Sequence, residues 1–293
     1  MRVLVTGGGG FLGSHIADAL SQAGHDVILF DLQPSPYTRP DQTMEVGSVL
    51  DRERVEALVH QVQAVYHLAA IADIGHAMRN PRPTIEVNVL GTLNLLEAAR
   101  TAPLERFVFA SSIYVYSDQG SFYRVSKQAG EQLILSYGES FGLRHTILRF
   151  GSLYGPRSGP GNAVHDLITQ AVVNGKIDYA GTGHEVREYI HVLDAAAMAV
   201  DVLDASFADQ IIHLTGRERL TSREMLEMIR EIFGGEIEVN IKGTGMIGHY
   251  IHTPYNFTPR LGKRLIRQTY IDIGLGLLDY IQQRHAVLVE ENK

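Results

Sequence analysis

The stretch VLVTGGGGFLG, residues 3–13, decides the fold of this 293-residue chain. The β-branched run from Val3 to Thr6 leads into a Gly-x-x-Gly-x-x-Gly turn, and an apolar helical pattern follows. A strand, a glycine turn and a helix in this order are typical of a dinucleotide-binding unit. We expect Gly7 to allow the tight turn, Gly10 to let the backbone approach a pyrophosphate, and Gly13 to let the helix pack closely. Free N–H groups at the start of that helix would face the anion.

A carboxylate stands at the end of the second apolar run. Asp31 follows the run Val27–Phe30, roughly 20 residues after the glycine turn, where a carboxylate accepts hydrogen bonds from the adenosine ribose. Its charge would repel a 2′-phosphate, and no Arg or Lys lies in the glycine turn or directly after Asp31. We therefore predict NAD, rather than NADP, as the cofactor. The alternative for Asp31 is an ordinary turn-forming residue.

Short β-branched runs alternate with longer amphipathic stretches in the first half of the chain. These runs are Val3–Val5, Val27–Phe30, Val65–Leu68, Phe107–Phe109 and Thr146–Leu148. The rhythm predicts parallel βαβ units, and continuously apolar strands fit a sheet that is covered by helices on both faces. With right-handed crossovers, the simplest arrangement is an α/β fold with a Rossmann-type doubly wound parallel sheet.

The pattern changes beyond residue 155, where Pro and Gly residues interrupt the alternation. We predict an NAD-binding Rossmann domain over residues 1–155, and a smaller C-terminal α/β domain, mainly substrate-binding, over residues 156–293. Residues 186–216 are expected to return to the first domain, because Ile211–Leu214 looks like another buried strand. A helix capped by its first Thr or Ser is predicted over Thr221–Phe233.

Composition and charge exclude several classes of protein. The net charge of −7 argues against nucleic-acid binding, since phosphate contacts need clustered Lys and Arg. The absence of Cys excludes disulfides, thiolate catalysis and cysteine zinc sites. No apolar run reaches the roughly 18 residues of a membrane span, and no export signal follows Met1. We expect a cytoplasmic protein without a membrane partner. No metal site is predicted, because His249 and His252 lack a convincing third ligand.

Ser112, Tyr123 and Lys127 form the catalytic hypothesis. Ser112 follows the strand-like run Phe107–Ala110, and Tyr123 and Lys127 stand four residues apart in the next helical pattern. This spacing places the phenol and the ammonium on one helix face. The cation is expected to lower the tyrosine pKa from about 10, so that Tyr123 acts as a base near neutral pH. The alternative is a chance pair on an amphipathic helix; its combination with Ser112 and the glycine turn favours catalysis.

Together these motifs resemble the extended short-chain dehydrogenase/reductase family, particularly nucleotide-sugar epimerases similar to UDP-glucose 4-epimerase. The resemblance covers nearly the whole chain. It rests further on His67–Ala70, Asn88–Thr92, Leu148–Phe150, Tyr154–Arg157 and Arg187–Asp194. It implies an NAD-dependent enzyme that transiently oxidises a nucleotide sugar at C4 and returns hydride to the opposite face, with the cofactor retained.

The resemblance also implies roles for individual residues. Ser112 would hydrogen-bond the reacting sugar oxygen, Tyr123 would remove its proton, and Lys127 would hold the nicotinamide ribose. Arg187 would pair with the nucleotide diphosphate, with a surface ion pair as the alternative, and Asn162 would touch the diphosphate or the sugar. The expected cofactor-binding residues are Gly7, Gly10, Phe11, Leu12, Gly13, Asp31, Leu68, Ala69, Ala70, Asn88, Tyr123 and Lys127. Among these, Asn88 is expected to order the cofactor region.

The sequence departs from the family pattern where substrate is recognised. Only six residues separate Tyr116 from Tyr123, whereas relatives carry a longer loop. Unusual residues stand at positions that relatives use near the nucleotide or sugar: Ser48, Ser117, Ser152 and Ala180, the last beside Tyr179. Sugar dehydratases carry an Asp-Glu pair directly after the catalytic Ser or Thr, and here those positions hold Ile113 and Tyr114. Dehydration, and decarboxylation that relies on a nearby Glu, are therefore disfavoured.

Two alternatives to a 4-epimerase remain. One is a nucleotide-keto-sugar reductase, which would consume its cofactor. The other is a non-catalytic dinucleotide sensor, against which the presence of Ser112, Tyr123 and Lys127 argues. The helical stretches from Thr84 to Arg100 and from Tyr123 onward resemble a pair that relatives use in a four-helix dimer interface, so a homodimer is expected.

Overall fold

The computed structural model describes residues 1–217, 219–245 and 248–251. The chain separates into two units, Met1–Phe257 and Thr258–Lys293. The description below concerns the first unit. The last part of the predicted C-terminal domain, from His252 onward, lies outside the described residues.

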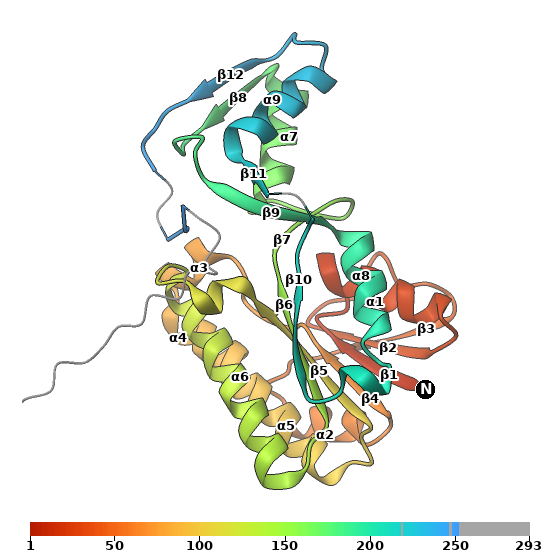
Figure 1. The fold of residues 1–293 in the computed structure, drawn as a ribbon. Helices are drawn as coiled ribbons and strands as arrows, with labels where there is room; N and C mark the ends of the chain where they lie inside the picture. Colours follow the sequence, from red (N-terminus) through yellow and green to blue (C-terminus); the bar gives the residue numbers. More distant parts are fainter. Residues whose placement is uncertain (218, 246–247, 252–293) are drawn as a thin grey trace, which may run out of the picture. The chain divides into compact units, whose positions relative to one another are not determined.

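A seven-stranded parallel sheet forms the centre of the first unit (Figure 1). Its strands are β1 (Arg2–Thr6), β2 (Asp26–Asp31), β3 (Gln42–Val46), β4 (Ala64–His67), β5 (Arg106–Ser112), β6 (His145–Phe150) and β10 (Gln210–Leu214). They lie in the order β10-β6-β5-β4-β1-β2-β3, and every neighbouring pair is parallel. The strand order reverses between β1 and β4, where ligands bind in doubly wound sheets. The predicted Rossmann-type sheet is confirmed.

Helices cover both faces of this sheet, which explains why its central strands are apolar on both sides (Figure 1). One face packs against α1 (Phe11–Gln22) and α8 (Val192–Asp201), and the other against α2 (Arg52–Val59), α5 (Gly91–Thr101) and α6 (Ser121–Phe141). Successive β1 residues alternate between the faces. Val3 and Val5 belong to the α1 and α8 side, and Leu4 to the α2, α5 and α6 side. Each such buried side chain contributes roughly 1.5–3 kcal/mol.

A smaller group of elements follows β6. Its strands form a three-stranded sheet in the order β11-β9-β7 and a parallel pair, β12-β8. The elements are β7 (Ser152–Tyr154), α7 (Ala163–Asn174), β8 (Lys176–Tyr179), β9 (Val186–His191), β11 (Arg219–Thr221), α9 (Ser222–Ile232) and β12 (Glu238–Ile241). Helices α7 and α9 close an apolar cluster over Ile177 and Tyr179. As predicted, Thr221 caps α9, and Glu224 completes a reciprocal capping box.

The run from Thr84 to Arg100 is less regular than the single helical stretch predicted. It follows α3 (Ile74–Arg79) and divides into α4 (Pro81–Ile85), one π-helical turn, η1 (Glu86–Leu90), and α5. The π turn contains Asn88. Single π turns inside helices often accompany functional sites, because they re-aim one side chain. Short 3₁₀ segments, η2 (Ile113–Tyr116) and η3 (Ala205–Phe207), complete the connections.

Two edge strands depart from the predictions. Strand β3 was not predicted, because its sequence QTMEV has little apolar character, and none of its residues is buried. The segment Ile211–Leu214 was predicted as a buried strand. It does join the sheet as β10, paired with β6, but it lies at the edge and only Leu214 is buried. An edge strand pairs along one side only, so an apolar run there does not imply enclosure on both faces.

The described residues contain neither a metal-ligand cluster nor a membrane-length apolar helix. No three His, Cys, Asp or Glu side chains in this part of the chain lie close enough to hold a metal ion. None of its helices combines the length and the apolar character that a bilayer crossing requires. His249, one of the two histidines considered as metal ligands, instead lies 2.8 Å from the Tyr114 hydroxyl through its Nδ1.

Candidate active site

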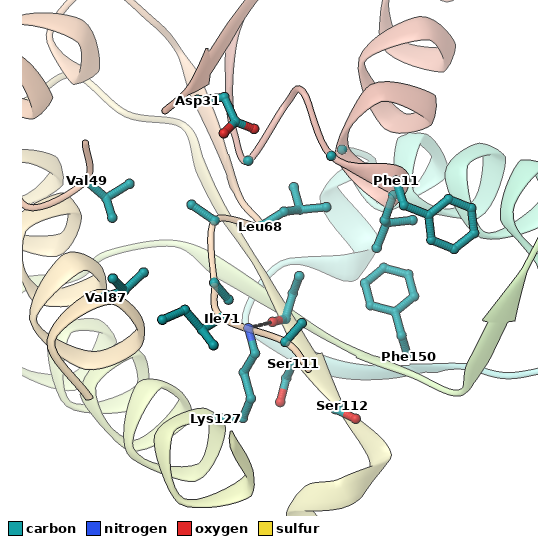
Figure 2. Close-up of a pocket in the computed structure, with 18 of the residues that line it drawn as sticks. Phe11, Asp31, Val49, Leu68, Ile71, Val87, Ser111, Ser112, Lys127 and Phe150 are labelled. Carbon is teal, nitrogen blue, oxygen red and sulfur yellow. Dashed lines mark hydrogen bonds between the residues drawn. The ribbon is translucent and has the colours of Figure 1, made fainter. Parts of the chain in front are cut away.

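A cavity of about 550 Å³ opens at the carboxyl ends of the central strands (Figure 2). It is lined by the glycine turn, by the ends of β2, β4, β5 and β6, and by the start of α6. The lining includes every expected cofactor-binding residue but Asn88, namely Gly7, Gly10, Phe11, Leu12, Gly13, Asp31, Leu68, Ala69, Ala70, Tyr123 and Lys127. The fold therefore gathers these residues around one space.

The glycine turn has the shape that a pyrophosphate requires. Gly7 has a φ of +70°, which favours glycine. A Cβ on Gly13 would lie 2.0 Å from the carbonyl oxygen of Gly7, so no other residue fits without opening the turn. Helix α1 begins after Gly10, without a side-chain cap and without an acidic residue in its first turn. Its first N–H groups are thus oriented to bind an anion, and the cradle fits a dinucleotide.

Asp31 joins the glycine turn to β2. One carboxylate oxygen accepts from the Gly9 N–H at 2.9 Å and the other from the Leu32 N–H at 2.7 Å. The side chain lies across the cavity from Lys127 (Figure 2). Because each carboxylate oxygen has a second lone pair, these bonds leave Asp31 able to accept hydrogen bonds from a ribose.

Asn88 lies behind the cavity wall and is buried. Its amide nitrogen donates to the Ile71 carbonyl at 3.0 Å and to Ser126 Oγ at 2.9 Å, and its amide oxygen accepts from the Ile71 N–H at 2.7 Å. Ile71 lines the cavity, and Ser126 lies between Tyr123 and Lys127 on α6. The π turn that carries Asn88 therefore fixes the Ile71 segment of the cavity wall against α6, the helix that carries Tyr123 and Lys127.

His67 ties three elements together behind the glycine turn. Its ring nitrogens lie 2.8 Å from Thr6 Oγ1 on β1 and 2.8 Å from Thr92 Oγ1 on α5. Burial lowers the pKa of His67 to about 3, and the Lys127 charge acts in the same direction. The imidazole is therefore neutral, with one nitrogen donating and the other accepting.

The predicted catalytic residues Ser112, Tyr123 and Lys127 line the same end of the 550 Å³ cavity. Ser112 ends β5, and Tyr123 and Lys127 lie on the first turns of α6. The Lys127 ammonium donates to the Ala110 carbonyl at 2.7 Å (Figure 2). It lies 4.9 Å from the centre of the Phe109 ring and 5.9 Å from that of Tyr123.

The pKa of Tyr123 corrects one prediction. Burial raises the pKa of Tyr123, and a hydrogen bond with Ser112 partly offsets this, with no resolved contribution from Lys127. Burial also lowers the pKa of Lys127 to about 8, although Glu131 opposes the change. The expected depression of the tyrosine pKa by the ammonium is therefore wrong in this structure. The ammonium donates to the Ala110 carbonyl, and desolvation of the phenol sets the direction of the Tyr123 pKa.

A second cavity, of about 450 Å³, adjoins the first. Ser112 and Tyr123 line both cavities, so the phenol and the hydroxyl stand at their junction. The second cavity is also lined by α7, β9 and residues 249–250, and it includes both expected substrate-binding residues, Asn162 and Arg187.

Arg187 is a buried cation with unused hydrogen-bonding capacity. Its side chain is buried, its guanidinium lies 4.1 Å from the centre of the Tyr250 ring, and its Nη1 donates to the Val186 carbonyl at 3.0 Å. Its Nη2 is buried and has no hydrogen-bond partner among the described residues. The alternative of a surface ion pair is therefore wrong. A buried charge in this state strongly favours an anion that enters the cavity.

Asn162 has a local structural use. Its amide oxygen caps α7 by accepting from the His165 N–H at 3.1 Å, and its amide nitrogen donates to the Leu153 carbonyl at 2.8 Å. Both ends of the side chain are thus engaged within the protein. It lines the second cavity, and its contact with substrate stays a prediction.

Several residues of the second cavity were not predicted. Tyr189, His249 and Tyr250 line it. Tyr189 lies within the Arg187–Asp194 motif but was given no role, and His249 was considered only as a metal ligand. His249 and Tyr250 belong to residues 248–251, and two backbone hydrogen bonds anchor this segment. The Gly120 N–H donates to the Gly248 carbonyl at 2.9 Å, and the Val186 N–H donates to the Ile251 carbonyl at 2.8 Å.

Two of the four unusual positions line the cavities, and Ser117 and Ala180 line neither. Ser48 lines the first cavity and Ser152 the second. Ala180 is absent from the lining of either cavity, whereas its neighbour Tyr179 lines the second. The Tyr179 hydroxyl lies 2.7 Å from the Ser222 hydroxyl, which fixes the ring in the cavity wall.

Comparison with known families and proteins agrees with this geometry. Residues 3–214 match the NAD dependent epimerase/dehydratase family. An uncharacterised UDP-glucose epimerase of Bacillus subtilis is 30% identical over 263 residues, covering 80% of this chain and 83% of that protein. More distant relatives include a UDP-glucuronic acid decarboxylase of Arabidopsis thaliana, 28% identical, and a dTDP-glucose 4,6-dehydratase of Actinoplanes, 26% identical.

Solved structures show the same architecture. The UDP-glucose 4-epimerase of Thermus thermophilus in complex with NAD has a TM-score of 0.76 at 30% identity, covering 90% of this chain and 95% of that one. The UDP-glucuronic acid 4-epimerase of Bacillus cereus, in complex with UDP-glucuronic acid and NAD, has a TM-score of 0.80 at 25% identity, covering 89% and 95%.

Proposed function

Because the chain belongs to the NAD dependent epimerase/dehydratase family, we propose that it is a nucleotide-sugar 4-epimerase that oxidises the sugar transiently at C4 and reduces it from the opposite face. NAD is its cofactor. The observation that carries the proposal is the junction at Ser112 and Tyr123. These two residues line both the cavity with the dinucleotide cradle and the cavity with Arg187, whose Nη2 has no partner among the described residues.

The proposed roles follow from where each side chain lies. When bound, NAD supplies reversible hydride acceptance. Ser112 hydrogen-bonds the reacting sugar oxygen and offsets part of the rise in the Tyr123 pKa that burial causes. Tyr123 takes the hydroxyl proton, and Lys127 binds the nicotinamide ribose. Asp31 accepts from the adenosine ribose, and Arg187 binds the diphosphate, with Asn162 at the edge of that site.

We propose that NAD and the nucleotide sugar are bound by the two parts of the chain that the sequence predicts as separate domains. Residues 1–155, together with part of 186–216, hold NAD, and residues 156–293 mainly hold the nucleotide sugar. In support, β10 lies in the central sheet and α8 packs on the same face as α1. Strand β9 pairs with β7 and β11, so α8 and β10 make the return to the first domain.

Epimerisation is favoured over elimination because the carboxylates that line the second cavity are already used in hydrogen bonds at helix ends. Asp73 and Asp166 line it, and both are used at helix ends. Asp73 caps α3 by accepting from the His76 N–H, and Asp166 accepts from the Gly161 N–H at 3.2 Å. Directly after Ser112 stand Ile113, which is buried, and Tyr114. A hydride that leaves and returns at one carbon needs no additional carboxylic acid, whereas loss of water does.

A panel of nucleotide sugars tests the proposal. The purified protein with its bound NAD would be incubated with UDP-, GDP-, CDP- and dTDP-sugars, including UDP-glucose and UDP-glucuronic acid, and product stereochemistry would be determined by NMR. We expect a C4 epimer from at least one UDP-sugar, without added cofactor and without net formation of reduced NAD. Product that forms only with stoichiometric NADH would indicate the keto-sugar reductase. Binding of NAD without conversion of any sugar would indicate the sensor.

We also propose a homodimer formed through α5 and α6, and a cytoplasmic location. Apolar side chains on α6 are exposed, among them Phe122 and Val125, and Leu90 is exposed just before α5. Such a surface is typical of a helical dimer interface. Light scattering should give twice the 32.4 kDa chain mass. A monomer at micromolar concentration would contradict this part of the proposal.

A further inference from the structure

Glu131 is a buried carboxylate on the helix that carries Tyr123 and Lys127. It stands one helical turn beyond Lys127 on α6, it is 3% exposed, and it lines neither cavity. Its carboxylate accepts from Ser111 Oγ at 2.5 Å and, as a fork, from Arg149 Nε at 2.9 Å and Nη2 at 2.5 Å. Charge-assisted bonds of this kind hold a side chain in one position.

These bonds tie α6 to two strands that end at the first cavity. Ser111 precedes Ser112 at the end of β5, and both lie with Lys127 at the same end of the cavity (Figure 2). Arg149 lies on β6, the neighbouring strand of the sheet. Glu131 therefore fixes the end of β5 against the helix face that presents the ammonium.

The carboxylate of Glu131 also acts on Lys127 through its charge. Side chains four residues apart on a helix are neighbours, and a carboxylate in that place favours the charged form of an ammonium. Burial lowers the pKa of Lys127 to about 8, and Glu131 opposes this change. Lys127 therefore keeps its proton near neutral pH partly because of Glu131.

Other carboxylates around α6 are engaged elsewhere. Glu86 of η1 and Glu97 of α5 form exposed ion pairs, with Arg82 and Arg100 respectively. Asp31 lies across the cavity and is bonded to the glycine turn (Figure 2). Burial keeps the titratable groups of the nearby elements neutral, among them His67 on β4, Tyr114 on η2 and Tyr123 on α6.

We propose that Glu131 is a positioning residue of the reaction, which fixes the end of β5 beside the phenol and keeps Lys127 in the ammonium form that binds the nicotinamide ribose. This role rests on the proposed function, because the phenol and the ammonium serve the hydride transfer proposed there. Arg149 balances the charge of the buried carboxylate, which allows Glu131 to stay ionised.

Lysine NMR tests the effect on the ammonium without relying on turnover. Protein with bound NAD is labelled with ¹³C-lysine, and the side-chain carbon signals are followed over a pH titration. We expect the midpoint for Lys127 to fall by about one pH unit in Glu131→Gln, because the charge that favours the ammonium is lost. Assignment by substitution is practical because the chain has five lysines: Lys127, Lys176, Lys242, Lys263 and Lys293.

Turnover should follow the same charge. With the midpoint one pH unit lower, kcat of Glu131→Gln should be reduced about fivefold at pH 8 and less than about twofold at pH 6, where Lys127 regains its proton. KM for the nucleotide sugar and the bound NAD content should stay as in the wild type. A loss caused by looser packing would persist at both pH values.

Ser111→Ala tests the contact through β5 separately. It removes the hydroxyl that Glu131 accepts from and leaves the carboxylate charge in place. We expect kcat to fall about 10-fold at every pH, with an unchanged Lys127 midpoint, because Ser112 is less firmly held. Wild-type turnover in Ser111→Ala would overturn this part of the role.

Two further variants separate charge from packing. Glu131→Gln/Arg149→Met removes both charges of the buried pair, a replacement that is often neutral for stability, and it should keep the lowered Lys127 midpoint. Asp18→Asn is the matched control. Asp18 is likewise a mostly buried carboxylate, paired with Arg157 at 2.7 Å, and it lines neither cavity. It should leave the Lys127 midpoint and the pH dependence of kcat unchanged.

The outcomes separate this role from the proposed function. An unchanged Lys127 midpoint in Glu131→Gln overturns the role, and C4 epimerisation by the wild type then still supports the proposed function. A loss of kcat in Glu131→Gln that is equal at pH 6 and pH 8 also overturns the role. If the wild type converts no nucleotide sugar, the proposed function fails, and the part of Glu131 in the reaction fails with it, whatever the midpoint.

Discussion

The two cavities that meet at Tyr123 are built in different ways. The first is assembled from loops that directly follow parallel strands. Its Asp31 is bonded to the Gly9 N–H, and Asn88, behind its wall, is bonded to Ile71. The second is assembled from η2, α7, β9 and residues 249–250, and it contains the Arg187 guanidinium with a nitrogen that has no partner in the described part of the chain.

This difference suggests that the first cavity serves the fold and cofactor binding, whereas the second serves substrate recognition. In the first cavity the hydrogen bonds that shape the site also hold the sheet together, so a change there disturbs both stability and cofactor binding. In the second cavity Arg187 keeps one nitrogen, Nη2, without a partner among the described residues, and its guanidinium is suited to an anionic ligand. Changes there should alter substrate binding while the fold and the cofactor remain.

Replacing Gly13 by Ala should break the first cavity most severely. The new Cβ would lie 2.0 Å from the oxygen and 2.8 Å from the carbon of the Gly7 carbonyl, and backbone atoms cannot move aside without opening the turn. We expect a loss of about 3 kcal/mol in the free energy of unfolding, together with loss of bound NAD. Denaturant unfolding and the NAD content of the purified protein measure the two effects.

Gly159→Ala is the matched control, since a Cβ there would meet nothing within 4 Å. It should change the free energy of unfolding by no more than about 0.5 kcal/mol. A Gly13→Ala protein with wild-type stability and NAD content would contradict the account of the cradle.

Replacing Arg187 by Met should affect the second cavity alone. The variant loses charged hydrogen bonds to the diphosphate, so we expect KM for the nucleotide sugar to rise roughly 10- to 100-fold. Bound NAD should be retained, and thermal stability should not fall, because a buried cation without a full set of partners is removed.

Arg219→Met is the control for loss of a positive charge near this region. Arg219 is largely exposed, and its Nε lies 3.7 Å from the carboxylate of Glu188, which is buried. We expect KM to change by less than about twofold. If Arg187→Met lowers the NAD content as much as the affinity for the sugar, the separation between the two cavities is wrong.

The buried His67, behind the first cavity, should make the free energy of unfolding depend on pH, and this effect is smaller than the two above. Its pKa is lowered to about 3 from the ordinary 6.5. Below pH 6.5 the unfolded chain therefore binds a proton that the folded chain does not, and stability falls as the pH decreases toward 3. This single group should contribute about 1.4 kcal/mol per pH unit in that window.

The contribution is measured by comparing wild type with His67→Gln. Unfolding free energies between pH 4 and 6 should fall less steeply in the variant than in the wild type, by roughly the slope of one proton. Parallel slopes would show that His67 is not held neutral by the fold.

The sequence allowed the first cavity to be predicted because its residues lie next to the motifs that make the fold. Gly7, Gly13 and Asp31 are each within a few positions of a strand end, so local pattern and final location coincide. The edge strands were harder. Strand β3 has too few apolar residues to be recognised, and β10 has enough of them to look buried although it lies at the edge.

The second cavity could be predicted only in part. Arg187 was found through a family motif, but His249 and Tyr250 come from a segment whose place depends on hydrogen bonds to Gly120 and Val186. Such long-range contacts leave no local pattern. The direction of the Tyr123 pKa was also missed, because helical spacing places Lys127 correctly but cannot show that burial outweighs its charge.

Tyr123→Phe tests the central claim, that one phenol at the junction serves both cavities. The change removes the hydroxyl and keeps the ring, so the account predicts wild-type NAD content and binding of the nucleotide sugar, with turnover reduced by about 100-fold or more. A Tyr123→Phe enzyme that interconverts the C4 epimers at the wild-type rate would contradict it.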